Sequence, residues 1–306
     1  FHSIFAKFLR KHAHHVGLKS NFNILDSEDQ KKLIKQVLEY CKIDKEVSES
    51  IYLNEIQNLK DEKIFPQDKS KILKYSSLEN IDEIYNIYQQ RLIEINAVDF
   101  GDILLHSYFI LTNHKDIQET HSNFIQHILI DEFQDTNLLQ YDLIKLLLNN
   151  NQNLFCVGDD DQSIYAWRGA KIENIINFPN EFNCEVVRLT KNYRSNNAIL
   201  EAASSIISNN KNRLGKNLES FNNEIPEQKI NLKSFYSQEE ESLWVADNIS
   251  RKYNYQESFG ILVRLTAQMR SIEDKLIKYA LPYEIIGGPR FFERKEIKDV
   301  LSYLKL

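Results

Sequence analysis

Residues 127–137 read His-Ile-Leu-Ile-Asp-Glu-Phe-Gln-Asp-Thr-Asn, and this stretch determines the fold more than any other. Its apolar run is followed by similar short runs at 154–157 and 185–189, with helical stretches at 138–149 and 170–178 between them. Short apolar strands that alternate with helices indicate a buried parallel sheet built of βαβ units. Ligands of such sheets bind at the carboxyl ends of the strands, which is where the acidic residues fall.

The region before this sheet has helical periodicity. Residues 24–60 repeat apolar side chains at helical spacing, and Ser27 with Gln30 forms a capping-box pattern. Residues 60–77 are polar and contain a proline, so we expect a loop or a connection between a pair of helices there. Helical periodicity resumes over 78–96, and together these segments predict one small helical unit.

A second change of pattern follows residue 192, where a second α/β unit is expected. A loop-like stretch rich in Asn, Lys and Glu covers 209–229. The expected elements are a helix over 195–208, a strand over 230–235, a helix from a Ser237–Glu240 capping box to about 253, a strand over 259–263, a helix over 267–279, a strand over 283–286 and a helix from about 293.

The composition is that of a globular protein without membrane segments. Of 306 residues, 42% are hydrophobic and 27% charged, and no apolar run approaches the ~18–20 residues of a membrane span. Only 8 Gly and 5 Pro favour long helices. Three scattered cysteines argue against a disulfide scaffold and fit a reducing compartment. A net charge of -6 excludes a basic nucleic-acid coat, but not a local basic or aromatic groove.

The first polar stretch with chemical potential is Asp131-Glu132-Phe133-Gln134-Asp135. A carboxylate at the end of a strand can hold Mg²⁺, and its neighbour can orient and deprotonate an attacking water. A strand that runs into a solvated acidic turn is the competing interpretation. Gln134 and Asp135 favour the chemical one, because they place further polar groups at the same edge.

The second stretch covers 157–170 and reads Val-Gly-Asp-Asp-Asp-Gln-Ser-Ile-Tyr-Ala-Trp-Arg-Gly-Ala. Gln162 can contact a phosphate or a bound water, and Arg168 can pair with phosphate. Tyr165 and Trp167 can stack on bases, at roughly 1–3 kcal/mol per base. Alternatively, the aromatic residues are core and the three aspartates are a solvated turn or a metal site.

The third stretch is Leu189-Thr190-Lys191-Asn192-Tyr193-Arg194-Ser195. Tyr193 can stack on an adenine. Arg194 can neutralise charge on a transferred phosphoryl group, an effect worth about 10³–10⁵ in rate where such arginines have been dissected. Alone, the stretch reads as a capped helix start.

In this order and spacing, the three stretches resemble motifs II, III and IV of superfamily I DNA helicases of the UvrD/PcrA/Rep type. Phe1-His2-Ser3 resembles the tail of that family's motif Ib, and residues 97–104 resemble its Asp-Phe-x-Asp-Leu-Leu segment. Residues 281–299 resemble the stretch before its 2B insertion. The resemblance covers nearly the whole chain.

The resemblance implies a role for each matching position. Asp131 would bind Mg²⁺, Glu132 would be the general base for ATP hydrolysis, and Gln162 would sense the γ-phosphate. The implied catalytic residues are Glu132, Gln162 and Arg194, and the implied residues for ATP and Mg²⁺ are Asp131, Gln134, Tyr193 and Arg168. The implied DNA-binding residues are Phe1, His2, Tyr165, Trp167 and Arg264.

The resemblance also implies an architecture of RecA-like parallel sheets with helices on both faces, in the α/β class, plus a helical insertion. Residues 1–19 and 96–190 would form part of ATPase domain 1A, 20–95 the insertion 1B, and 191–306 the first part of domain 2A. The implied function is an ATP-dependent three-prime to five-prime helicase on single-stranded or duplex-junction DNA. The expected location is the bacterial cytoplasm, at the nucleoid, with unidentified DNA-repair proteins as further partners.

Two departures from the family pattern matter. No Gly-Lys-Ser or Gly-Lys-Thr occurs in the chain, so we expect it to bind ATP poorly by itself. The chain starts at Phe1 and also lacks motifs V and VI, so we expect it to be an internal part of a longer helicase. Thr266 stands where the family often has Asn, which leaves one DNA contact in doubt.

Three other functions remain open from the sequence. The first is a degenerate module that binds DNA or a partner without ATPase activity. The second is the helicase part of a recombination nuclease. The third is a stand-alone Mg²⁺ phosphohydrolase built on the aspartates at 159–161, which would not explain the aromatic residues that follow them.

Overall fold

The computed structural model describes residues 1–43, 48–148, 153–211, 213–221, 229–254, 256 and 258–287. The chain divides into two compact units, Phe1–Ile225 and Pro226–Leu306. Within the described residues, no helix is both long and apolar enough to cross a membrane.

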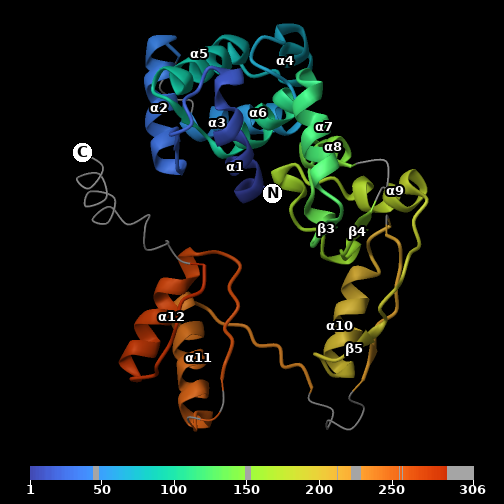
Figure 1. The fold of residues 1–306 in the computed structure, drawn as a ribbon. Helices are drawn as coiled ribbons and strands as arrows, with labels where there is room; N and C mark the ends of the chain where they lie inside the picture. The colour runs from blue at the N-terminus through green and yellow to red at the C-terminus, as the bar shows by residue number, and fades with distance from the viewer. Residues whose placement is uncertain are drawn as a thin grey trace. The chain divides into compact units, whose positions relative to one another are not determined.

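The first unit contains ten helices of the described chain and three pairs of short strands (Figure 1). The helices are α1 (His2–His12), α2 (Ser27–Tyr40), α3 (Glu49–Asp61), α4 (Lys69–Tyr75), α5 (Ile81–Glu94), α6 (Phe100–Asn113), α7 (Lys115–Phe124), α8 (Leu138–Leu147), α9 (Ile172–Phe182) and α10 (Asn197–Ile207). The strands are β1 (Asn23–Ile24), β2 (Ala97–Val98), β3 (Ile128–Ile130), β4 (Leu154–Cys156), β5 (Lys191–Asn192) and β6 (Glu219–Ser220).

The expected mixed α/β fold with parallel strands is confirmed. All three strand pairs, β1–β2, β3–β4 and β5–β6, are parallel. In the described residues each sheet has only two strands, so the sheets are smaller than expected. The β3–β4 pair aligns Leu129 with Phe155, and these two side chains are 74% and 63% exposed. One face of this pair is therefore open and apolar.

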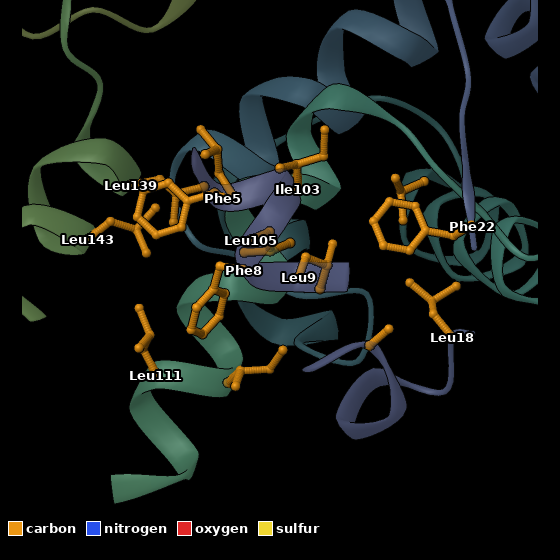
Figure 2. Packing of buried hydrophobic residues seen from close by; sticks show 14 of the residues in the cluster. Phe5, Phe8, Leu9, Leu18, Phe22, Ile103, Leu105, Leu111, Leu139 and Leu143 are labelled. Atoms are coloured by element: carbon orange, nitrogen blue, oxygen red, sulfur yellow. The ribbon is translucent and has the colours of Figure 1, made fainter. Parts of the chain in front are cut away.

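One large core of the first unit forms where α1 packs on α6. Phe5, Phe8 and Leu9 of α1 are buried against α6, and Leu139 and Leu143 of α8 join the same cluster (Figure 2). Helix α6 begins with a complete capping box, in which the Asp99 side chain accepts the Asp102 N–H and the Asp102 side chain accepts the Asp99 N–H. This cluster connects the N-terminal helix to the helices that follow the helical unit.

A separate core holds α2, α3, α4 and α5 together, and of these helices the periodicity over 24–60 and 78–96 predicts α2, α3 and α5. The cluster is centred on Ile34, Tyr52, Ile56, Ile84 and Tyr88, all nearly inaccessible to solvent.

The boundaries of two of these helices differ from the sequence prediction. Asp26, not Ser27, caps α2, because its carboxylate accepts the N–H groups of Glu28 and Asp29. The expected loop or helix connection over 60–77 contains α4, which forms after the proline and buries Ile72. A single buried apolar residue gave too weak a periodic signal for this helix.

A third core lies beneath the ends of β3 and β4. Ile130, Phe133, Tyr141, Ile144 and Phe178 bring together β3, α8 and α9. The predicted helices at 138–149 and 170–178 are confirmed as α8 and α9, and that at 195–208 as α10. This packing fixes the direction in which the chain leaves β3.

The second unit contains α11 (Gln238–Lys252) and α12 (Ala267–Lys278), which pack through Ala246, Leu276 and Leu281. Both helices were expected. The Ser237 hydroxyl accepts the Glu240 N–H at 3.1 Å, so the predicted cap of α11 is confirmed.

Four predicted strands are not strands in the structure: 185–189, 230–235, 259–263 and 283–286. Their apolar residues are exposed instead; Leu189 is 80% and Leu262 99% accessible. A strand needs a partner for its ladder of hydrogen bonds, and the described chain offers these segments none. The helix expected from about 293 lies outside the described residues.

A buried ionic cluster joins the helical unit to α6. Lys60 at the end of α3 is inaccessible to solvent, and its Nζ lies 2.6 Å from Asp99 Oδ2 and 2.7 Å from Asp102 Oδ1. Tyr88 donates to the same oxygen of Asp99, and Gln89 donates to Asp102. Burial alone would lower the pKa of Lys60, but the charges of Asp102 and Asp99 outweigh it and raise the pKa.

We expect Lys60→Met to destabilise the protein by about 3–5 kcal/mol, because it leaves two adjacent carboxylates buried without a cation. Denaturant unfolding followed by circular dichroism measures the loss. Lys32→Met is the matched control, since Lys32 is exposed in a surface pair with Asp29, and it should cost less than about 1 kcal/mol. Equal losses in the two variants would contradict a structural role for the cluster.

Asp61, the next residue, has an unusual environment for a carboxylate. It is buried at the end of α3, and its Oδ1 accepts hydrogen bonds from Gln57 Nε2 and Asn137 Nδ2, both at 2.9 Å. Burial raises the pKa of Asp61 to about 7, although the Gln57 hydrogen bond opposes this shift. Asn137 caps α8, so this group connects the helical unit to the loop after β3.

We expect Asp61→Asn to stabilise the protein above pH 7 by roughly 2–4 kcal/mol. The pKa of Asp61 rises from its ordinary 3.8 to about 7 in the folded protein, so the stability that its protonated form provides is complete below pH 3.8. That stability is lost as the pH rises through 7. Urea unfolding of both proteins from below pH 3.8 to above pH 7 measures the difference.

Asp82→Asn is the control, and we expect it to change the stability of the protein in the opposite direction. A hydrogen bond from Lys69 lowers the pKa of Asp82, so the stability it provides is present near neutral pH and is lost as the pH falls through its folded-state pKa. If both variants changed stability in the same direction at pH 8, the assignment for Asp61 would be wrong.

Candidate functional site

The loop after β3, residues 131–137, is here called the acidic loop. It begins at the carboxyl end of the strand, where Val157 N–H donates to Ile130 O at 2.8 Å and Phe133 N–H donates to Val157 O at 3.0 Å. These bonds continue the β3–β4 ladder past the strands. They hold the acidic loop against the loop after β4.

Glu132 adopts a left-handed backbone conformation, with φ 52° and ψ 44°. A non-glycine residue in this region is strained, and such residues concentrate at functional sites. Its N–H donates to Asp131 Oδ1 at 3.0 Å, so the two acidic residues are fixed relative to each other. Both are exposed, as a ligand contact requires.

Gln134 is buried and connects the two loops. Its Nε2 donates to Glu132 Oε2 at 2.7 Å, and its Oε1 accepts the N–H of Asp159 at 2.9 Å. Gly158 permits this approach, because a Cβ there would lie 2.8 Å from Gln134 Oε1 and 3.2 Å from the main-chain N of Phe133. The structure thus gives the Gln134 amide two protein partners, beside its predicted role in cofactor binding.

Asp135 completes the acidic loop. Burial raises its pKa, and the charge of Glu132 adds to the rise. Its Oδ1 is buried and has no hydrogen-bond partner among the described residues. Oxygen ligands of this kind suit Mg²⁺, which retains several waters and needs one or two carboxylates. Within the described chain, no group of three or more His, Cys, Asp or Glu is arranged to hold a metal alone.

The loop after β4, residues 157–163, is here called the Asp-triplet loop. Asp159 organises it: its carboxylate accepts the Asp161 N–H at 3.0 Å, the Gln162 amide at 2.6 Å and an ion pair from Lys216. Burial would raise the pKa of Asp159, but the bonds from Lys216 and Gln162 outweigh it and lower the pKa. Gln162, the predicted γ-phosphate sensor, is therefore oriented by Asp159.

Tyr165, Trp167 and Arg168 form one cluster in the same part of the chain. The Arg168 guanidinium lies 5.0 Å from the Tyr165 ring centroid and 4.5 Å from that of Trp167. Trp167 is 69% exposed, so it is not a core residue in the described chain. The cluster presents aromatic and cationic surface to solvent.

Tyr193 and Arg194 follow β5 in a short turn. Asn192 Oδ1 accepts the N–H groups of Arg194 and Ser195 at 3.0 and 2.7 Å, which fixes the turn. The Tyr193 ring is exposed and packs on Phe221, with ring centroids 4.7 Å apart.

The remaining predicted DNA-binding residues lie elsewhere. His2 packs edge-on against Phe100 at 5.8 Å, and burial lowers its pKa. Phe1 lines an apolar pocket of about 530 Å³ that also includes Ile128 and Asp131. Arg264 is exposed in the second unit.

The structure thus brings seven predicted positions into two groups. Asp131, Glu132, Gln134 and Gln162 join one hydrogen-bonded network through Asp159, and Arg168 joins the two aromatic residues. Sequence reasoning missed Lys216 and Arg213, which contact the Asp-triplet loop. The aspartate triplet could have indicated these two cations, because three adjacent carboxylates are stabilised by cations nearby.

The sequence matches two family models along its length. The UvrD/REP helicase N-terminal domain matches residues 1–183, and the UvrD-like helicase C-terminal domain matches residues 187–306. The resemblance drawn from the three polar stretches is thereby confirmed.

Individual relatives align with the whole chain. DNA helicase II of Haemophilus influenzae is 41% identical over 313 residues, which covers 100% of this chain and 42% of that protein. A protein named Probable DNA helicase II homolog, from Rickettsia felis, is 39% identical over 316 residues, covering 100% and 48%. ATP-dependent DNA helicase PcrA of Staphylococcus aureus is 37% identical over 311 residues, covering 100% and 42%. The chain therefore spans less than half the length of these curated relatives.

With one family model covering more than half of its residues, the chain belongs to the UvrD/REP helicase family.

Proposed function

We propose that this chain is part of an ATP-dependent DNA helicase that moves three-prime to five-prime along single-stranded DNA. The names of its relatives, DNA helicase II and ATP-dependent DNA helicase PcrA, support this proposal. The observation that carries it is the bridge from Glu132 through Gln134 to Asp159, because it ties an exposed carboxylate to the loop of Gln162.

In the proposed reaction, Glu132 accepts the proton of the water that attacks the γ-phosphoryl group. Gln134 binds Oε2 of Glu132 and leaves Oε1 as the proton acceptor. Gln162 contacts the γ-phosphate, and Arg194 offsets the charge that develops on it. Tyr193 stacks on the adenine.

Mg²⁺ would be held by Asp131, and when bound it neutralises charge on the phosphates of ATP. The exposed carboxylates of the acidic loop fit that role. The chain contains no Gly-Lys-Thr or Gly-Lys-Ser loop to surround the phosphates. We therefore propose that the isolated 306-residue chain hydrolyses ATP poorly.

The proposed DNA contacts are of two kinds. Tyr165 and Trp167 stack on bases, because they are aromatic and, in the case of Trp167, mostly exposed. Arg168 connects this stack to phosphate, His2 and Arg264 contact the DNA backbone, and Phe1 is a further DNA-binding residue. The substrate class is single-stranded DNA next to a duplex.

We propose that residues 1–19 and 96–190 belong to the first ATPase domain, 20–95 to its helical insertion and 191–306 to the second ATPase domain. The proposed location is the bacterial cytoplasm at the nucleoid, where the DNA substrate lies. Unidentified DNA-repair proteins are the proposed further partners.

In the full-length protein, Glu132→Gln should reduce the turnover of ATP by about 10²–10⁴-fold while ATP binding is retained, because only proton transfer is removed. Steady-state ATPase assays and equilibrium nucleotide binding measure the two properties. Glu201→Gln, which changes an exposed residue of α10, is the control and should leave both unchanged. Unchanged turnover in the Glu132 variant would disprove the general-base assignment.

Trp167→Ala should weaken binding of single-stranded DNA by about 5–150-fold, which corresponds to loss of one stacked base. DNA-stimulated ATPase should fall more than basal ATPase. Trp244→Phe, in the only other tryptophan of the sequence, is the control. Equal loss of basal and stimulated activity in the Trp167 variant would indicate a structural role instead.

A further inference from the structure

Three residues of the segment 213–216 bind all three aspartates of the Asp-triplet loop, and we call this segment the clasp. The pairs are Arg213 with Asp161, the Leu214 N–H with Asp160, and Lys216 with Asp159. The clasp is thus paired with the triplet in reverse order, with one clasp residue for each carboxylate.

The strongest contact of the clasp is the bidentate ion pair between Arg213 and Asp161. Arg213 Nε lies 2.8 Å from Asp161 Oδ1 and Nη2 lies 2.6 Å from Oδ2, the planar fork that a carboxylate matches best. The two side chains are only 20% and 12% exposed, so water screens the pair less than a surface pair. Arg188 Nη1 also donates to Gly215 O at 3.2 Å, and this hydrogen bond helps to fix the backbone of the clasp.

Neutralisation of charge explains why the clasp is needed. Three adjacent carboxylates in a half-buried loop repel one another. Arg213, Lys216 and one backbone N–H offset that repulsion. All three aspartates therefore have protein partners, which argues against the stand-alone phosphohydrolase built on 159–161.

The clasp connects directly to the proposed catalytic groups. Asp159 uses Oδ1 for Lys216 and Oδ2 for the Gln162 amide. The N–H of the same residue donates to Gln134, whose amide binds Glu132. Lys216 is therefore linked to Gln162 through Asp159. It is linked to Glu132 through Asp159 and Gln134.

The clasp and the loop belong to different family matches. Residues 159–161 lie in the part matched by the N-terminal domain model, and 213–216 lie in the part matched by the C-terminal one. In the structure both segments lie in the same compact unit, Phe1–Ile225. Withdrawal of the clasp would leave three uncompensated carboxylates next to Gln162.

We propose that Arg213 and Lys216 are positioning residues, which hold the Asp-triplet loop so that Gln162 and Glu132 are aligned for ATP hydrolysis. This inference rests on the proposed function for its catalytic consequence, but not for the clasp itself. Two experiments separate these parts.

The first experiment measures DNA-stimulated ATPase of the full-length protein with Arg213→Gln or Lys216→Gln. We expect kcat to fall by about 3–30-fold, the range for residues that act through others, with little change in KM for ATP. Lys211→Gln removes a charge from an exposed neighbour of the clasp and should have no effect. Arg213→Lys should recover activity only in part, because it keeps the charge and loses the fork.

A charge swap tests the pairing itself. Asp161→Arg combined with Arg213→Asp should be more active than either single variant, because the ion pair is restored in reverse. A double variant no more active than its worse parent would overturn the pairing. Unchanged kcat in both Arg213→Gln and Lys216→Gln would overturn the positioning role.

The second experiment needs no activity. Trypsin cuts after Arg and Lys, and the clasp should slow cleavage after Arg213 and Lys216 relative to cleavage after exposed Lys211, as quantified by mass spectrometry of the full-length protein. Asp161→Asn should accelerate cleavage after Arg213. Equal cleavage at all three sites in the unmodified protein would refute the clasp. If Arg213 and Lys216 are protected from trypsin but the full-length protein has no ATPase activity, the proposed function is refuted and the clasp still stands.

Discussion

A single buried amide, that of Gln134, connects the two loops on which the proposed chemistry depends. One end of the amide binds the Glu132 carboxylate and the other accepts the main-chain N–H of Asp159. The bridge forms only because β3 and β4 end side by side and because residue 158 has no side chain. Packing of Ile130 and Phe133 on α8 and α9 holds this geometry from below. The rest of the site is arranged around that bridge.

Much of the fold could be predicted from the sequence. Strands β3 and β4 were found from short apolar runs that end in acidic residues, and most helices were found from apolar periodicity of 3.6 residues. The four extended segments that were wrong have the same apolar character as β3. Local pattern indicates that a segment is extended, but whether it becomes a strand depends on a partner elsewhere in the chain. Short α4 was missed because it offers only one buried apolar residue.

The residue types of the site were predictable, but their connections were not. The order of Asp131, Glu132 and Gln162 in the sequence shows which groups are available. It does not show that Gln134 is buried between them, or that Lys216 reaches Asp159 from more than fifty positions away. The raised pKa of Asp61 has the same origin, since burial comes from tertiary packing and leaves no local trace in the sequence.

The open face of β3 and β4 has a practical consequence for anyone who prepares this protein. Leu129 and Phe155 stand next to each other on that face, mostly exposed, on a sheet that has two strands and unpaired outer edges among the described residues. Such a surface is a template for other chains, which add as extra strands and grow into insoluble material. Concentration, storage and crystallisation of the 306-residue chain will therefore be limited by self-association at this face. A soluble fusion partner, or charged residues placed there, would relieve the problem.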